Sequence, residues 1–288
     1  MPSPRKPSLL KVGVAQTASK QFDFAATLAE FRARCEEARA QGVELLVFPE
    51  AFFGGYPKFS SFGASVGVRA SAGRRDFASY YAGSIAVPSA ESDAIAAVAK
   101  ELQLAVITGF IEREGTTVYC SLLHVDPERG VVGVHRKVLP TAAERLIWGN
   151  GDGSKANLTA HRLQLRGVNE AVDEPKREVT VGGGICWENM MPLLRYQYYQ
   201  QGVQVYVAPT VDARPNWLHS MVHIAMESRC FVLSANQFAT VGDFPEWHQS
   251  TMHATLEQPG SSEFKPADWT PETEIIGGGS CIISPLGE

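Results

Sequence analysis

Apolar residues in this 288-residue chain form many short, nearly continuous runs, a pattern typical of strands buried in a folded core. Glycine, proline or charged residues bound most of these runs, as turn residues bound strands. We therefore predict strands at 9–17, 43–50, 104–112, 118–125, 131–137, 158–165, 179–185, 203–208 and 231–234, with a last strand around Ile282 and Ile283.

Between several of these runs, apolar residues recur at helical spacing. A stripe through Phe31 and Cys35 predicts the first helix, and Gly42 has the position of the glycine that commonly ends one. Ser89 has the position of an N-cap for the second. We predict helices at 24–40, from Ser89 to about 103, at 190–202 and at 216–229.

Strands followed by helices favour an α/β fold, and the runs between 104 and 137, joined by a Glu-Gly turn near 114–115, add antiparallel pairings to its sheets. Three polar or glycine-rich stretches are predicted to be loops, at 52–63, 166–178 and 239–274. The chain contains no repeat, low-complexity segment or composition break. We therefore expect residues 1–288 to form one domain.

Composition narrows the class of partner. Hydrophobic residues make up 44% of the chain and charged residues 20%, which is usual for a globular protein. The net charge of −5 argues against nucleic acid or an anionic membrane as the main partner and leaves a small-molecule substrate open. No apolar run approaches the ~20 residues that cross a bilayer, and the N-terminus lacks the apolar core of a signal peptide. We expect a cytoplasmic location.

The five cysteines are scattered and form no C-x-x-C pair, so neither a disulfide framework nor a zinc site is predicted. Four of them lie within or beside apolar runs and are expected in the core: Cys35, Cys120, Cys230 and Cys281. Cys186 differs, because it stands among glycines in GGGICWEN (182–189), where a predicted strand gives way to a helix.

A cysteine at such a bend has the position of a catalytic nucleophile. Unpaired N–H groups at the start of the following helix would stabilise a thiolate and hold an anion. The alternative is that Cys186 is a small buried hydrophobic residue, as free cysteines usually are. This stretch of sequence does not separate the two interpretations.

Glu50 ends an apolar strand in FPEAF (48–52). Burial at that point would raise the pKa of its carboxyl group, as a general base working near neutral pH requires. The alternative is an ordinary glutamate that turns to solvent at the end of a strand.

Lys137 follows a predicted strand in HRKVLPT (135–141), and its ammonium group is suited to offset negative charge that develops on a substrate. A surface basic cluster with His135 and Arg136 is the alternative. Glu144, in ERLIWGNGDGS, is close enough in sequence to share a site with Lys137, although a glutamate in a helical turn is common.

Glu50, Lys137 and Cys186, in this order and each at a strand end, resemble the pattern of the carbon–nitrogen hydrolase (nitrilase) superfamily. The resemblance extends from Val12 to Leu286. It is sharpest in HRKVLPT-x2-ERLIWGNGDGS, GICWEN-x-MPLLR, APT-x-DAR-x-NW (208–217) and HIAMES-x-CFVLSANQF (223–238). These strings are more similar to the nitrilase branch than to the amidase or carbamoylase branches. The resemblance implies a four-layer α-β-β-α sandwich with two mixed sheets.

The resemblance also implies roles. Cys186 would attack a nitrile carbon to give a thioimidate, and Glu50 would take the thiol proton and later activate water. Lys137, helped by the backbone N–H of Trp187, would stabilise the anion, and Glu144 would position Lys137 and substrate. Loss of ammonia would leave a thioester that water converts to the acid, whereas early loss of the thiolate would give the amide. This chemistry needs no metal and no organic cofactor.

Several aromatic residues near these motifs are candidates for a substrate pocket, with core packing as the alternative for each. They are Trp187, Phe53, Tyr56, Trp148 and Trp217. Four histidines are expected in helix packing or on the surface, including a subunit interface, because their spacing lacks a Glu-x-x-His context. They are His219, His223, His248 and His253.

Two other functions remain open. The same residues would serve an amide-directed hydrolase or a nitrile or cyanide hydratase. The second possibility is an inactive protein that serves as an assembly or binding module. The presence of Glu50, Lys137 and Cys186 argues against this second possibility.

The resemblance implies a homodimer or larger homo-oligomer. The stretch 161–178 is longer than the hairpin usual in the family. Relatives also usually continue beyond the position of Glu288 with residues that cover a sheet edge, and an uncovered edge invites pairing.

Overall fold

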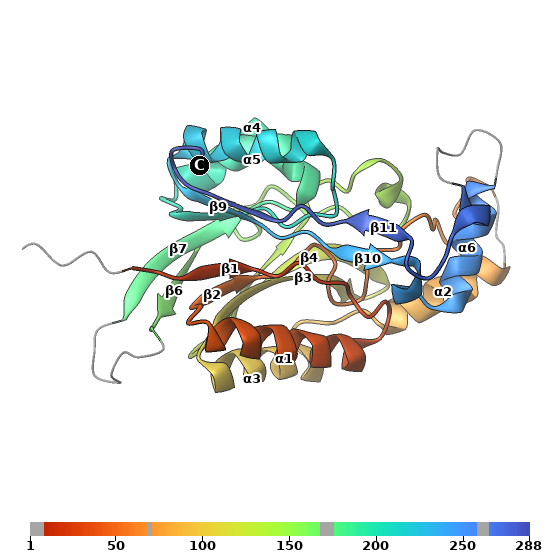
Figure 1. Ribbon diagram of the computed structural model, residues 1–288, viewed down its shortest axis with the longest axis horizontal. Coiled ribbons are helices and arrows are strands. Elements are labelled where there is room, and N and C mark those ends of the chain that lie inside the picture. Colours follow the sequence, from red (N-terminus) through yellow and green to blue (C-terminus); the bar gives the residue numbers. More distant parts are fainter. Residues whose placement is uncertain (1–8, 68–70, 168–175, 258–264) are drawn as a thin grey trace, which may run out of the picture.

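In the computed structural model, which describes residues 9–67, 71–167, 176–257 and 265–288, two five-stranded sheets stack face to face. Figure 1 shows α1 (Phe24–Ala40) and α3 (Ala90–Leu102) covering one sheet, and α4 (Pro192–Tyr199) and α5 (Pro215–Ser228) covering the other. This confirms the four-layer α-β-β-α sandwich.

Both sheets are mixed. The first has the order β1-β2-β3-β4-β5, with β1 to β3 parallel and the rest antiparallel. Its strands are β1 (Val12–Val14), β2 (Leu45–Val47), β3 (Ala105–Glu114), β4 (Thr117–Asp126) and β5 (Gly130–Arg136). The second has the order β12-β9-β8-β7-β6, with β7, β8 and β9 parallel. Its strands are β6 (His161–Leu165), β7 (Arg177–Gly183), β8 (Val205–Val207), β9 (Phe231–Ser234) and β12 (Cys281–Ile283).

Three apolar clusters hold the layers together. One lies between the sheets and joins β2 and β3 to β7, β8 and β9 through residues such as Val47, Ile107 and Val207. The others lie between each sheet and its helices, around Phe31 and Trp217. Because the parallel strands are covered on both faces, they show the continuous apolar runs from which they were predicted.

The first helix has the predicted bounds, and its ends show why. The Asp23 side chain accepts a hydrogen bond from the Ala26 N–H (2.9 Å), and Gly42 adopts a φ of +85° where the chain leaves the helix. At α3, Ser89 caps the helix as predicted and exchanges hydrogen bonds with Ser92.

Two helices were not predicted. The stretch 239–274, expected to be a loop, contains α6 (Glu246–Leu256) and most of β10 (Phe238–Thr240), and it ends at the first residue of β11 (Glu274–Gly277), which pairs antiparallel with β10. A further helix, α2 (Ser71–Ala82), lies beside α6 at one end of the sandwich (Figure 1). The loop prediction is therefore wrong at α6 and at the strand residues, and 258–264 lie outside the described residues. The helix α2 buries only Gly73 and Tyr80, and the buried row of α6, which holds Met252 and Leu256, begins with the polar His248, so neither shows a long apolar stripe.

The segment after Cys186 also differs from the prediction. A 3-10 turn, Cys186–Met190, begins at the cysteine itself, and α4 begins only at Pro192 and ends at Tyr199. The predicted loop at 166–178 lies largely outside the described residues, and its last two residues belong to β7. Within the described parts of the chain, no helix has the length and apolar character to span a membrane.

The sandwich brings one set of strand ends together. Glu50 follows β2, Lys137 follows β5, Cys186 follows β7 and Thr210 follows β8. Close backbone packing beneath Glu50 depends on Gly109 of β3, where an added Cβ would lie 2.7 Å from the Glu50 Cα and 2.2 Å from a neighbouring carbonyl oxygen. The first sheet thus carries the carboxylate and the lysine, and the second carries the thiol.

Candidate active site

Glu50, Lys137 and Glu144 form a buried cluster of charges. The Lys137 ammonium lies 2.7 Å from Glu50 Oε1 and 2.8 Å from Glu144 Oε2. The exposed fraction of the side chain is 0% for Glu50 and Lys137 and 12% for Glu144. Glu144 also accepts hydrogen bonds from the Tyr56 hydroxyl (2.8 Å) and the Thr141 N–H (2.6 Å). The structure thus brings together three of the predicted site residues.

Glu50 is held from two sides and is not solvated. Its Oε1 accepts a hydrogen bond from the Lys137 ammonium and a long one from Cys120 Sγ (3.6 Å). Its backbone carbonyl accepts a hydrogen bond from Gln237 Nε2 (2.9 Å). Among the described residues, its Oε2 has no hydrogen-bond partner. Burial raises the pKa of Glu50, although Lys137 acts against this. The solvent-facing alternative is therefore wrong for this glutamate, which has the environment of a general base.

Lys137 is not part of a surface cluster. Burial by itself would lower its pKa, but the charges around it, with Glu50 the strongest, hold the pKa well above its ordinary value. Its ammonium also lies 5.5 Å from the centre of the Trp148 ring. The neighbouring Arg136 points elsewhere and pairs with Glu112 at 2.6 Å. The lysine therefore stays charged inside the protein.

Cys186 lies at the bend between β7 and the 3-10 turn, with a φ of +48° and an exposed fraction of 4%. Its N–H donates to the Pro209 carbonyl (2.8 Å), and the Thr210 hydroxyl donates to its Sγ (3.2 Å). Burial raises the pKa of Cys186, the Glu50 charge raises it further, and Lys137 lowers it. The expected stabilisation of a resting thiolate is thus wrong: the thiol is the resting form, and a base must take its proton.

Glu188 joins the backbone beside Lys137 to the backbone beside Cys186. Its Oε1 accepts from the Val138 N–H (2.7 Å), and its Oε2 accepts from the Ile185 N–H (2.7 Å). One amide follows the lysine and the other precedes the cysteine. A single buried carboxylate therefore fixes the two segments relative to each other.

A buried histidine completes this arrangement. His135 Nε2 lies 2.8 Å from Glu188 Oε2, and its Nδ1 lies 3.0 Å from the Asn157 carbonyl oxygen. Burial lowers the pKa of His135, but the Glu188 carboxylate outweighs this and raises it above its ordinary value. The sequence analysis did not single out Glu188, although its place two residues after Cys186 was a usable signal.

Glu188→Gln is expected to lower kcat by about 10- to 100-fold with little change in KM, because an amide cannot accept hydrogen bonds at both of its ends as the carboxylate does. The two segments would then shift relative to each other without loss of the pocket. Steady-state kinetics and circular dichroism check this. Glu178→Gln, on an exposed position of β7, is the matched control. An unchanged kcat in a folded Glu188→Gln protein would contradict the role.

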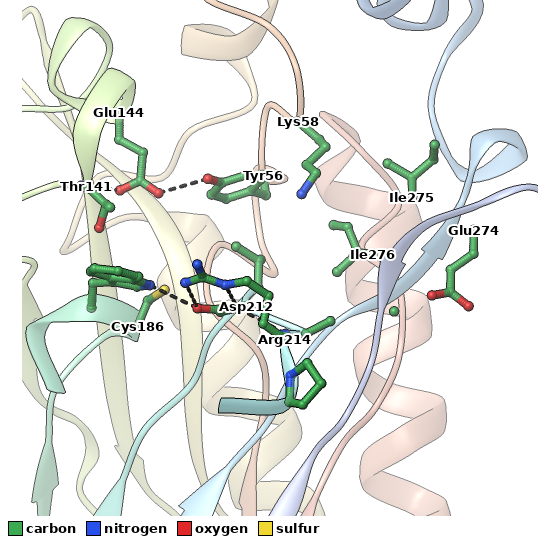
Figure 2. Close-up of a pocket in the computed structure, with 15 residues that line it drawn as sticks. Tyr56, Lys58, Thr141, Glu144, Cys186, Asp212, Arg214, Glu274, Ile275 and Ile276 are labelled. Atoms are coloured by element: carbon green, nitrogen blue, oxygen red, sulfur yellow. Dashed lines mark hydrogen bonds and ion pairs between the residues drawn. The ribbon is translucent and has the colours of Figure 1, made fainter. Parts of the chain in front are cut away.

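Cys186 opens onto a pocket of about 580 Å³. Figure 2 shows Tyr56 and Glu144 on the same side of it as the cysteine, with the β11 segment opposite. Its lining residues include both apolar and charged side chains: Tyr56, Lys58, Thr141, Glu144, Cys186, Trp187, Val211, Asp212, Ala213, Arg214, Pro215, Glu274, Ile275, Ile276 and Gly277. A neighbouring hollow of about 430 Å³ shares Tyr56 and Lys58 with it and adds Trp148 to the wall.

The five aromatic candidates divide into two groups. Tyr56, Trp187 and Trp148 line these two hollows. Phe53 instead packs with other phenylalanines beneath α1, and Trp217 is buried between α5 and the second sheet. For these last two, the expectation of a substrate contact is wrong. Phe53 is only three residues from Tyr56, but two glycines with positive φ lie between them, and the two rings belong to different apolar clusters.

The histidine interpretations fit the structure. His219 and His223 lie exposed on α5, and His248 is buried in α6 with its Nε2 2.9 Å from the Lys58 carbonyl oxygen. Within the described ranges, no group of three His, Cys, Asp or Glu side chains is arranged as a metal site. Of the other cysteines, Cys281 is partly exposed and Cys120 lies directly beneath Glu50.

Known proteins resemble this chain along nearly its whole length. The carbon–nitrogen hydrolase family model matches residues 11–288. The chain is 43% identical over 280 residues to the arylacetonitrilase of Trametes versicolor (strain FP-101664), covering 97% of this chain and 82% of that protein. It is 42% identical over 278 residues to the bifunctional nitrilase/nitrile hydratase NIT4A of Nicotiana tabacum, covering 96% of this chain and 72% of that protein.

Among solved structures, the fold is similar to that of an amidase from Nesterenkonia sp., with a TM-score of 0.64. The match covers 97% of this chain and 84% of the amidase at 16% identity. At that identity the likeness concerns the fold alone.

Proposed function

Because this chain belongs to the nitrilase branch of the carbon–nitrogen hydrolase family, we propose that it hydrolyses a nitrile to the carboxylic acid and ammonia. The observation that carries the proposal is a pocket-lining thiol, Cys186, beside a buried Glu50–Lys137 pair, in a chain 43% identical to an arylacetonitrilase. A thiol, a base and a fixed positive charge are the groups that addition to a carbon–nitrogen triple bond requires.

The first half of the proposed reaction forms a covalent bond. Glu50 takes the Sγ proton as the sulfur of Cys186 attacks the nitrile carbon, and the proton passes to the nitrogen to give a thioimidate. The raised pKa values of Glu50 and Cys186 support the roles of base and nucleophile. The Glu50 carboxylate is a stronger base than usual, and the Cys186 thiol does not ionise by itself.

The second half consumes two water molecules. The first adds to the thioimidate carbon, the nitrogen leaves as ammonia, and a thioester to Cys186 remains. The second water, activated by Glu50, hydrolyses the thioester, so that acid is released and the thiol re-forms. If the carbon–sulfur bond of the first water adduct breaks before the carbon–nitrogen bond, the product is the amide.

Lys137 and Glu144 support the intermediates in this proposal. The Lys137 ammonium supplies a fixed positive charge toward the nitrogen or oxygen that becomes negative, together with the Trp187 N–H at the start of the 3-10 turn. Glu144 holds that ammonium at 2.8 Å and, through the Tyr56 hydroxyl, links it to the pocket wall. Tyr56, Trp148 and Trp187 are proposed to contact substrate.

Assembly and location complete the proposal. We propose a homodimer or larger homo-oligomer that forms through the α4–α5 face, on which large apolar side chains are exposed, among them Leu193 (84%), Tyr196 (56%) and Met226 (48%). We also propose a cytoplasmic location, which five free cysteines support. Light scattering and fractionation test these two points.

The test of the activity is direct. Aliphatic and aromatic nitriles, and separately the matching amides, are incubated with the protein, and ammonia, acid and amide are measured. We expect ammonia and acid from at least one nitrile. Turnover of amides without nitriles would identify an amide-directed hydrolase, amide as the only product would identify a hydratase, and no turnover of either would favour an inactive assembly module.

A further inference from the structure

Lys58 lines the candidate active-site pocket and takes no part in the charge cluster around Lys137. Figure 2 shows its side chain across the pocket from Cys186, with the ammonium group directed into the cavity. It lines the neighbouring hollow as well. Among the described residues, no carboxylate lies within 4.0 Å of this ammonium, and the centre of the Phe59 ring lies 5.1 Å from Nζ.

The acidic groups of the pocket are already engaged or lie apart. Both Asp212 oxygens bind Arg214, at 2.8 and 2.6 Å, and Oδ2 also accepts from Trp187 Nε1 at 3.0 Å. Glu144 is shared by Lys137, Tyr56 and Thr141, as described above. Glu274 lies exposed on β11. The positive charge of Arg214 is therefore paired with Asp212, whereas Lys58 forms no ion pair with any residue that the structure describes.

The position of Lys58 is fixed by its backbone. Its N–H donates to the Tyr56 carbonyl (2.8 Å), and its own carbonyl accepts from His248 Nε2 of α6 (2.9 Å). Two glycines with positive φ, Gly54 and Gly55, shape the turn that precedes it. The lysine is thus presented from an ordered loop rather than from a free surface segment.

A partly buried cation without a protein anion is unfavourable, because desolvation is not offset by pairing. Burial accordingly lowers the pKa of Lys58, although the Asp212 carboxylate acts against this. An anion brought by a ligand would offset this cost at the place where the ligand binds. Buried side chains of this kind are preferred points of ligand recognition in pockets that are otherwise largely apolar.

We infer that Lys58 binds an anionic group of the substrate, so that the nitriles this pocket favours carry a carboxylate at the end opposite the cyano group. The inference rests on the proposed nitrile hydrolysis and adds a substrate class to it. With the cyano carbon at Cys186 and the carboxylate at Lys58, the chain between them would contact the apolar lining of the pocket, such as Ile276.

The experiment compares matched nitriles. The values of kcat/KM are measured for ω-cyanobutyrate, for its neutral methyl ester and for the cationic ω-aminobutyronitrile. We expect the kcat/KM of wild type to be about 10- to 100-fold higher for the carboxylate than for the ester, which corresponds to the free energy of one charge-assisted hydrogen bond. Lys58→Gln should remove that preference, Lys58→Arg should keep most of it, and Lys58→Glu should favour the amine.

Controls separate recognition from chemistry and from folding. Lys100→Gln, at an exposed position of α3, should leave the preference unchanged. In a Cys186→Ala background, calorimetry with ω-cyanobutyrate should show binding that Lys58→Gln weakens by a similar factor, and this readout does not depend on turnover. Circular dichroism reports whether each variant folds.

Three results would overturn the inference: a wild-type preference for the ester, equal losses for acid and ester in Lys58→Gln, or unchanged binding of ω-cyanobutyrate in the double variant. Equal losses would assign Lys58 to the chemical steps instead. Failure of the proposed function looks different, because no nitrile would be turned over while Lys58-dependent binding of the carboxylate persisted.

Discussion

Cys186→Ala is expected to release no measurable ammonia from any nitrile that wild type hydrolyses, a loss of at least about 10⁴-fold in kcat. The reason is chemical: among the described residues that line the pocket, Cys186 supplies the only thiol, and a water molecule that attacked in its place would lack the nucleophilicity of sulfur. Ammonia assays and mass spectrometry of the protein incubated with substrate measure the effect, since wild type should carry a covalent adduct and the variant none.

The fold should survive this change. Removing one sulfur atom leaves a small cavity beside Thr210 and costs about 1 kcal/mol in the free energy of unfolding. Cys281→Ala is the matched control, because Cys281 is a free cysteine of β12 outside the site. Ammonia release by Cys186→Ala at more than a trace level would refute the nucleophile assignment.

Lys137→Met is expected to be inactive and also destabilised, by about 3–5 kcal/mol, because it leaves Glu50 and Glu144 buried without their cation. Lys137 lowers the pKa of Glu50, so its removal lets burial raise that pKa further. Glu50 would then hold a proton at neutral pH and would be unable to act as a base. Urea unfolding and ammonia assays measure the two effects.

A second variant keeps this prediction testable if Lys137→Met does not fold. Adding Glu50→Gln removes one of the stranded carboxylates, so the double variant should recover part of the lost stability and remain inactive. Lys100→Met, at an exposed site on α3, should match wild type in both assays. A Lys137→Met protein with wild-type stability would contradict the prediction, because it would show that Glu50 and Glu144 do not need the Lys137 cation to remain buried.

The helices and strands that the sequence predicted best have an apolar buried face and capping or turn residues at their ends. The helix α1 has an apolar stripe through Phe31 and Cys35, an N-cap and a following glycine, and its bounds were predicted without error. The helix α6 was missed because one of its core-facing residues is His248, whose hydrogen bond to the Lys58 carbonyl replaces apolar contact. Polar burial of this kind leaves no periodic signal.

The candidate site shows the same division. Glu50, Lys137 and Cys186 were found because strand ends are visible in the sequence as the ends of apolar runs. Thr210 and Gln237 were missed because their contacts depend on side-chain direction across large separations in sequence, whereas Glu188, two residues after Cys186, left a signal that was not used. Gln237, for example, binds the Glu50 carbonyl across 187 positions of sequence.

By itself, the sequence determined the order of strands and helices, the positions at which reactive side chains follow strands, and the family to which these positions point. Local patterns suffice for this, because periodicity and turn residues act over a few positions. Only the tertiary structure decided that Glu50 and Lys137 are fully buried, that the Cys186 thiol is protonated at rest, and that Phe53 faces the core. Burial and charge proximity are made by segments distant in the chain, and no local pattern contains them.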